Sequence, residues 1–143
     1  MELTIDEALQ QGIAAHREGN IQEADRLYTA MLGTQPKHPD ANHNMGVLAV
    51  SIGKVDAALP FLKTALESNP KIEQFWLSYI DALIKLGQFD GARQVLGQAQ
   101  QQVPTSATFA AVKQDLVLKI GGAEIPLNPP QHDLDTLTKL YQN

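Results

Sequence analysis

A spacing of 34 residues that recurs along the chain constrains its fold more than any other feature of the sequence. Three landmark residue types each occur three times at this spacing. They are Gly19, Gly53 and Gly87; Ala24, Ala58 and Ala92; and Pro36, Pro70 and Pro104. Because three unrelated residue types keep one period without a slip, we predict three consecutive copies of a single structural unit.

The units cover residues 5–38, 39–72 and 73–106, and we number the positions of each unit from 1 to 34. Positions 8, 20 and 27 are mostly small, whereas position 24 is large and apolar or aromatic in all three units and position 4 includes Trp76. This pattern predicts two antiparallel helices, A and B, whose backbones approach closely at the small residues. Glycine at position 15 ends helix A, because it adopts the left-handed conformation cheaply. Proline at position 32 ends helix B, because it biases the preceding residue away from the α region.

Local residues predict the helix boundaries. Thr4 and Glu7 have the spacing of a capping box, so the first helix A should start at Ile5 and run to about Glu18. Proline inside a helix removes a hydrogen bond. If Asp56 is the N-cap, Pro60 is the fourth residue of its helix, and the first four N–H groups of a helix have no helical partner. Asp90 holds the equivalent position in the third unit. The other predicted ranges are 22–33, 40–52 and 57–68.

Two apolar clusters complete the predicted core. Trp76, Tyr79, Ile80 and Leu83 lie on one side of the third helix A, and we interpret them as core residues and not as a ligand cage. After Pro104, Thr105 or Ser106 should cap a further helix, residues 107–120. Its apolar residues are Phe109, Val112, Leu116 and Ile120. This helix would cover the last apolar face of the stack.

The last part of the sequence differs in composition. Residues 121–130 hold two glycines and three prolines and predict a linker. Residues 131–143 predict a helix with Leu134, Leu137 and Leu140 on one side, similar to helix A of a further repeat. We therefore expect the chain to be the N-terminal piece of a longer protein, with more repeats or a catalytic domain beyond it.

Composition excludes several classes of function. The 143 residues contain no cysteine, which removes disulfides, zinc-thiolate sites and cysteine nucleophiles. The net charge is −5 and no basic stripe occurs, so nucleic acid is a poor partner. The N-terminus does not resemble a signal peptide, and no stretch approaches the roughly 20 apolar residues of a membrane helix. We expect a cytoplasmic protein that does not bind membranes.

The sequence also lacks the motifs of catalytic and metal sites. His38 and His43 have no accompanying ligands in a metal-binding pattern, and Ser51, Ser68 and Ser78 have no patterned histidine and acid. Phosphate-binding glycine motifs and the nucleophile motif GxSxG are absent. We therefore expect no cofactor, no metal and no enzymatic activity.

The pattern of small, apolar, glycine and proline positions resembles the tetratricopeptide repeat family over residues 5–106. The resemblance implies an all-α, right-handed solenoid of three helix pairs, with a concave groove lined by the A helices at positions 2, 5, 6, 9, 12 and 13. The implied binding residues are Asp6, Leu9, Gln10, Ile13 and Arg17; Asp40, His43, Asn44 and Val47; and Gln74, Leu77, Ser78, Asp81 and Lys85. His16, Val50, Ser51 and Ile84 also occupy these positions.

Two binding modes known in the family can be compared with these residues. One type holds a peptide's terminal carboxylate with a clamp of lysine, arginine and asparagine. At the clamp positions this chain has Leu9, Ile13, Asn44, Gln74 and Ser78, so only the asparagine is kept and clamp binding is not expected. The second type, in O-linked N-acetylglucosamine transferases, grips a peptide backbone with successive asparagines at position 6. Here that position reads Gln10, Asn44 and Ser78.

The sequence also resembles the N-terminal repeats of bacterial multidomain proteins related to those transferases. We therefore expect an interaction module that binds a peptide or partner protein in the groove. The alternative is a scaffold for self-association through the C-terminal helix, or for docking to an attached transferase domain. Asn44 itself is open to two interpretations, a ligand-binding amide or a structural amide between helices.

Overall fold

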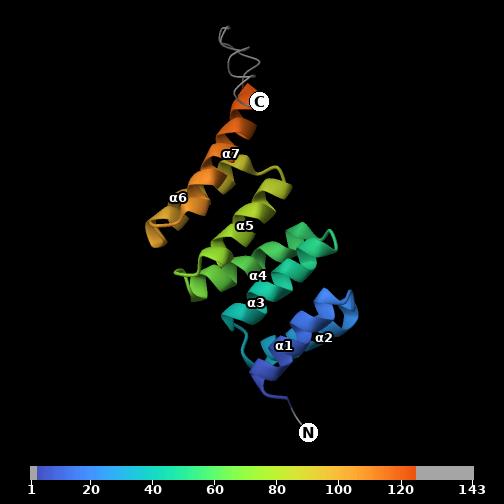
Figure 1. The fold of residues 1–143 in the computed structure, drawn as a ribbon. Helices are drawn as coiled ribbons and strands as arrows, with labels where there is room; N and C mark the ends of the chain where they lie inside the picture. Colours follow the sequence, from blue (N-terminus) through green and yellow to red (C-terminus); the bar gives the residue numbers. More distant parts are fainter. Residues whose placement is uncertain (1–2, 125–143) are drawn as a thin grey trace.

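In the computed structural model, residues 3–124 are described, and these residues form seven α-helices joined by short turns, without strands. The helices are α1 (Ile5–Arg17), α2 (Ile21–Thr34), α3 (Pro39–Ser51), α4 (Val55–Ser68), α5 (Glu73–Lys85), α6 (Phe89–Gln102) and α7 (Ala107–Glu124). Figure 1 shows the helix pairs stacked one after another from the N-terminus to the C-terminal end of α7. The predicted all-α fold of three helix hairpins followed by a further helix is confirmed.

Each helix packs against the next helix in the sequence, and the odd-numbered helices also meet one another, α1 against α3 and α3 against α5. The odd-numbered helices are the A helices of the predicted units. They therefore lie side by side on one face of the stack (Figure 1). This arrangement makes one continuous face from residues that are about 34 positions apart in the sequence.

Within each unit, helices A and B meet where position 8 lies against position 24. A Cβ atom added at Gly12 would lie 2.5 Å from Cε1 of Tyr28, and one added at Gly46 would overlap the side chain of Leu62. In the third unit these positions hold Ile80 and Leu96, and each is 1% exposed. The first two units therefore depend on the missing side chain of glycine for their close helix contact.

The predicted helix ends are confirmed where they depend on glycine, proline and the capping box. Gly19, Gly53 and Gly87 have φ values of +84°, +82° and +76°. Thr4 and Glu7 exchange hydrogen bonds of 2.9 and 3.0 Å at the start of α1. The three residues that precede the prolines at position 32 have φ between −149° and −131° and end their helices.

The prediction that Asp56 and Asp90 are N-caps is wrong. Each is the second residue of its helix, so Pro60 is the sixth residue of α4 and leaves one helical bond unmade. The backbone sets the start instead. Lys54 N donates to Ala49 O at 2.8 Å, a bond that closes the C-terminus of α3 after Gly53, and the carbonyl of Lys54 accepts the first bond of α4, from Ala58 N at 3.2 Å. Helix α4 therefore starts at Val55 without a side-chain cap.

The aromatic core of the third unit is confirmed. Trp76 and Leu83 are buried and Tyr79 is half-buried. The indole Nε1 of Trp76 donates to the carbonyl of Pro70 at 2.7 Å. Asn42, one unit earlier at the same position 4, donates to the carbonyl of Pro36 at 3.0 Å. Two different side chains thus satisfy the carbonyl of the preceding unit's proline.

Helix α7 departs from prediction at its C-terminal end. Ser106 caps it as expected, since its Oγ accepts from Phe109 N at 3.1 Å. The helix then continues to Glu124, so the first four residues of the predicted linker are helical. Glycine can adopt the helical region as well as the left-handed one, so two glycines did not force an end. The remaining linker and the predicted helix at 131–143 lie outside the described residues.

No helix within residues 3–124 combines the length and the apolar character needed to cross a membrane.

The surroundings of Gly46 and Gly97 predict that substitution by alanine changes stability in opposite directions at the two positions. Gly46→Ala should lower the free energy of unfolding by about 1–3 kcal/mol, because the new methyl overlaps Leu62. Gly97→Ala, in the exposed middle of α6 with nothing within 4 Å, should raise it by about 0.5–1 kcal/mol through helix propensity. Urea unfolding followed by circular dichroism measures both values. A Gly46→Ala protein as stable as Gly97→Ala would contradict the close helix contact.

Candidate binding groove

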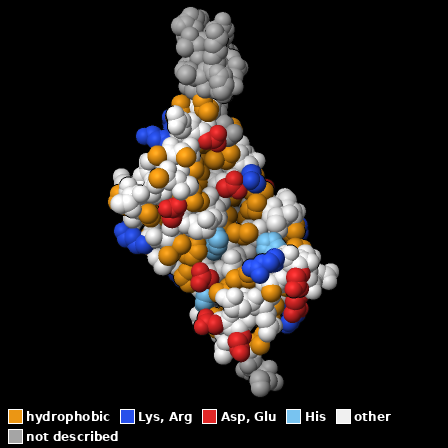
Figure 2. All heavy atoms as spheres, viewed as in Figure 1, with side chains coloured by type: hydrophobic (Ala, Val, Ile, Leu, Met, Phe, Trp, Pro, Cys, Tyr) orange, Lys and Arg blue, Asp and Glu red, His pale blue; other side chains and the backbone are white. Residues whose placement is uncertain are grey.

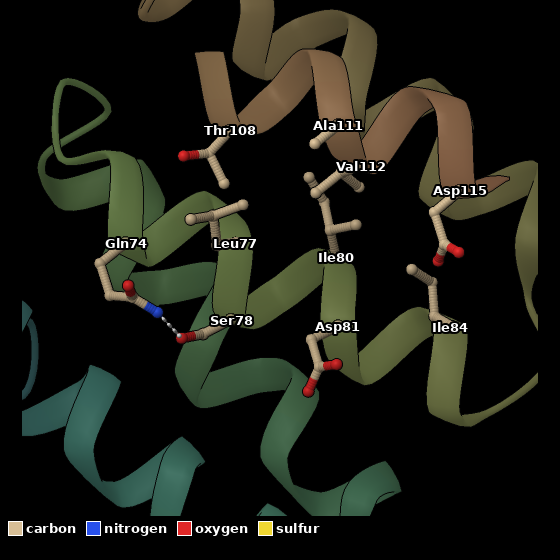
Figure 3. A pocket seen from close by; sticks show the side chains of 10 residues that line it. All are labelled: Gln74, Leu77, Ser78, Ile80, Asp81, Ile84, Thr108, Ala111, Val112 and Asp115. Carbon is tan, nitrogen blue, oxygen red and sulfur yellow. Dashed lines mark hydrogen bonds between the residues drawn. The ribbon is translucent and has the colours of Figure 1, made fainter. Parts of the chain in front are cut away.

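The face made by the A helices is hollowed between α3 and α5 and again between α5 and α7. The α3–α5 hollow has a volume of about 320 Å³ and is lined by His43, Asn44, Val47, Val50, Leu62, Gln74, Ser78 and Asp81. The α5–α7 hollow has a volume of about 440 Å³ and is lined by Gln74, Leu77, Ser78, Ile80, Asp81, Ile84, Thr108, Ala111, Val112 and Asp115 (Figure 3). Because three α5 residues line both hollows, they form one continuous depression, which we call the groove.

The structure brings together half of the residues predicted from the repeat positions. His43, Asn44, Val47, Gln74, Leu77, Ser78 and Asp81 line the groove. Asp40 and Lys85 are exposed but line neither hollow, and the first unit contributes to neither. Within that unit Asp6, Gln10 and Arg17 are exposed, and Ile13 is half-buried against the core.

Leu9 corrects the prediction for the first unit. Its side chain is only 8% exposed and belongs to a core cluster that includes Tyr28 and Met45. A position that lines the groove in later units is therefore used here to pack α1 on its neighbours. Leu9 offers almost no surface to a ligand.

Helix α7 contributes four groove residues that were not predicted. Thr108, Ala111, Val112 and Asp115 face α5 across the α5–α7 hollow (Figure 3). They occupy positions 2, 5, 6 and 9 when the 34-residue numbering is continued past residue 106. The repeat register could have identified them, but the sequence predicts a covering helix here because no second helix of a hairpin is predicted after it.

Ser78 lies at the middle of the groove and joins α3 to α5. Its Oγ is 2.7 Å from Nε2 of His43 and accepts from Nε2 of Gln74 at 3.2 Å. The His43 ring also lies against Phe75, with ring centroids 4.9 Å apart. These contacts fix the side chains of two neighbouring A helices on the groove surface.

The sequence showed no histidine in a catalytic pattern with Ser78, yet the structure places His43 within hydrogen-bond distance of it. The first two units have a matching pair, because Nε2 of His16 lies 3.1 Å from Oγ of Ser51. Both serines are in A helices, where neighbouring backbone N–H groups donate within the helix and do not form an oxyanion hole. The repeated pair is therefore a contact between adjacent units, since the two residues are 35 positions apart in each case.

The groove combines apolar surface with amide groups. Leu77, Ile80 and Val112 give the α5–α7 hollow an aliphatic centre, as Figure 3 shows. Asn44 and Gln74 present amides, which can donate and accept hydrogen bonds at once. In the space-filling view, hydrophobic and histidine side chains lie together on this face, with both acidic and basic side chains around them (Figure 2). Such a surface suits reversible binding of a chain that carries both peptide groups and aliphatic side chains.

Metal binding has no structural support in the described part of the chain, which contains no group of three histidine or acidic side chains placed to hold an ion. His38, one of the two histidines considered from the sequence, caps α3 through Nδ1, which accepts from Ala41 N at 3.1 Å.

Burial in the groove lowers the pKa of His43 from its ordinary value of 6.5, although Asn44 and Asp40 oppose part of this shift. The neutral ring fits its hydrogen bond to Ser78, because unprotonated Nε2 can accept the serine proton while Ser78 accepts from Gln74. The neutral form is therefore the one that the folded groove favours.

This shift predicts a pH dependence of stability. Below about pH 6.5 the unfolded chain binds a proton at His43 more readily than the folded chain, so acidification destabilises the fold. Urea unfolding of wild type and His43→Gln at pH 7 and pH 5 measures the effect. The stability advantage of wild type over His43→Gln should shrink at pH 5. If the stability difference between wild type and His43→Gln stays constant or grows at pH 5, the lowered pKa of His43 is contradicted.

Solved structures resemble this fold at low sequence identity. The Sgt2 TPR domain of Aspergillus fumigatus matches with a TM-score of 0.77 and 21% identity, over 88% of this chain and 85% of that chain. The first TPR of Spaghetti (RPAP3), solved with an HSP90 peptide bound, matches with a TM-score of 0.71 and 15% identity, over 80% of this chain and 93% of that chain. MamA of MSR-1 matches with a TM-score of 0.69 and 23% identity, over 96% of this chain and 79% of that chain.

The comparison with curated proteins gives no match to this sequence. A family model described as tetratricopeptide repeat matches residues 15–76 and, in a second placement, residues 49–116. The two placements together span most of the chain and overlap in the second unit, as expected for tandem copies. The chain therefore belongs to the tetratricopeptide repeat family.

Proposed function

We propose that the chain is an interaction module that binds an extended segment of a partner protein in the groove. The observation that carries this proposal is the continuous depression across α3, α5 and α7, lined by amides and aliphatic side chains. The backbone groups of these helices are used within the helices, so recognition falls to the side chains.

An extended segment suits this surface better than a second helix does. Its peptide groups are free of internal hydrogen bonds, so Asn44 and Gln74 can bond to them irrespective of the partner's side chains. The half-buried side chains of Leu77 and Ile84 leave room for alternate aliphatic side chains of the partner. Affinity then comes from a few central contacts.

The RPAP3 structure, which holds an HSP90 peptide, supports peptide binding by analogy of fold. That peptide ends in acidic residues, EEVD. At the positions where a carboxylate clamp would stand, this chain has Leu9, Ile13, Asn44, Gln74 and Ser78, none of them a cation. We therefore expect recognition of an internal segment and not of a terminal carboxylate.

The alternative from the sequence, a scaffold for self-association or for an attached transferase domain, depends on residues 131–143 and on what adjoins them. Those residues lie outside the described part of the chain, so this alternative stays a prediction.

Removal of the two groove amides tests the proposed function. Capped peptides selected from a random dodecapeptide library against wild type should bind Asn44→Ala/Gln74→Ala about tenfold more weakly, because each lost hydrogen bond costs about 0.5–1.5 kcal/mol. Fluorescence anisotropy measures the dissociation constants.

Gln98→Ala/Gln101→Ala is the matched control, since it removes two exposed amides from α6 and should bind as wild type does. Equal affinity of the groove variant and the control, or the absence of any selected peptide, would contradict the proposal.

A further inference from the structure

The chemistry of the groove changes along the α5–α7 hollow. Gln74 and Thr108 stand at one end, and Leu77, Ile80 and Val112 occupy the middle (Figure 3). At the other end Asp115 of α7 stands opposite Ile84 of α5, and Asp81 projects from α5 between Ile80 and Ile84 (Figure 3). A ligand that lies along this hollow therefore meets neutral polar, aliphatic and then acidic surface in turn.

The charge of the lining has one sign. Among the described residues that line the two hollows, the charged side chains are the carboxylates of Asp81 and Asp115, and no lysine or arginine is present. His43, the histidine of the α3–α5 hollow, has a lowered pKa and is neutral near pH 7. Aliphatic walls strengthen the field of these carboxylates relative to open water.

The cation that pairs with Asp81 is weakly held. Lys85 lies one turn after Asp81 on α5 and contacts its carboxylate at 3.0 Å. Both side chains are about half exposed, 49% for Lys85 and 53% for Asp81, and exposed pairs of this kind contribute little to stability. An incoming guanidinium, which binds a carboxylate through two parallel hydrogen bonds, can replace the lysine.

From this juxtaposition of an aliphatic hollow with an acidic end we infer that the preferred partner segment carries an arginine or lysine next to an aliphatic residue. The inference rests on the proposed function and names the class of peptide. The aliphatic residue packs on Leu77 and Val112, and the stem of the basic side chain crosses Ile84. Its charged end reaches Asp81 and Asp115.

The chain's own C-terminal segment fits this end poorly. Residues 125–143 carry Asp133 and Asp135 against a single lysine, Lys139, so their charge has the same sign as the lining. Charge complementarity therefore favours a separate basic segment as the occupant of the groove.

A positional library of capped nonapeptides, presented to the full chain at 50 mM salt, tests this inference. We expect arginine and lysine to be enriched beside leucine, isoleucine or valine with wild type. The enrichment should disappear with Asp81→Asn/Asp115→Asn and persist with Asp25→Asn/Asp56→Asn. The control changes the net charge equally but removes exposed carboxylates of α2 and α4, outside the groove lining.

A second measurement leaves the protein unchanged. The best arginine peptide should bind at least tenfold more tightly than its twin with citrulline, which keeps the shape and removes the charge. Groove-dependent peptides without basic enrichment would overturn this inference and leave the proposed function standing. Competition by a peptide of residues 125–143 that matches the selected peptides would also overturn it. No peptide binding at all would remove both.

Discussion

The close approach of two helices inside each hairpin is the contact on which the rest of this structure depends. In the first two units the backbone of helix A lies directly against a large side chain of helix B, Tyr28 or Leu62, because position 8 is glycine. In the third unit both positions hold large side chains, Ile80 and Leu96, and both are buried. Protein interiors tolerate neither voids nor overlap, so a methyl group added at Gly12 or Gly46 would force the facing side chain to move.

This contact has a consequence for the opposite side of helix A. Because helix B covers one side of each A helix, the other side is left to form the open face, where neighbouring A helices meet. Contacts between units on that face include side-chain hydrogen bonds, His16 with Ser51 and His43 with Ser78. Between α5 and α7 the face opens into the larger hollow, and binding chemistry is concentrated there. The groove is therefore a product of how each hairpin packs, with side chains at positions 2, 5, 6 and 9 setting its chemistry.

The sequence predicted the hairpins and their ends because the responsible residues act locally. Gly53 permits the left-handed turn that ends helix A at little cost, and Pro70 restricts the residue before it. The start of α4 was predicted wrongly because Lys54, which follows the glycine turn directly, is the N-cap and has no side-chain capping bond. Asp56 is the better capping residue type, so side-chain preference alone placed the start two residues too late.

The groove was predicted less completely, since its membership depends on how units pack. Leu9 occupies a groove position in the register but is buried in the core cluster that contains Tyr28 and Met45. Asp115 and Val112 line the groove at positions that the continued repeat numbering identifies. They were not predicted as groove residues because the sequence predicts α7 only as a helix that covers the end of the stack. The pairing of Ser78 with His43 joins residues 35 positions apart, and only the offset between stacked helices brings them together.

A double-mutant cycle at Gly46 and Leu62 tests the central contact most directly. Urea unfolding of wild type, Gly46→Ala, Leu62→Ala and the double variant gives the coupling free energy between the two positions. Leu62→Ala removes the atoms that a methyl at position 46 would overlap, so Gly46→Ala should cost much less in that background than in wild type. Additive effects within about 0.5 kcal/mol would show that the two helices do not meet there, and would contradict the account.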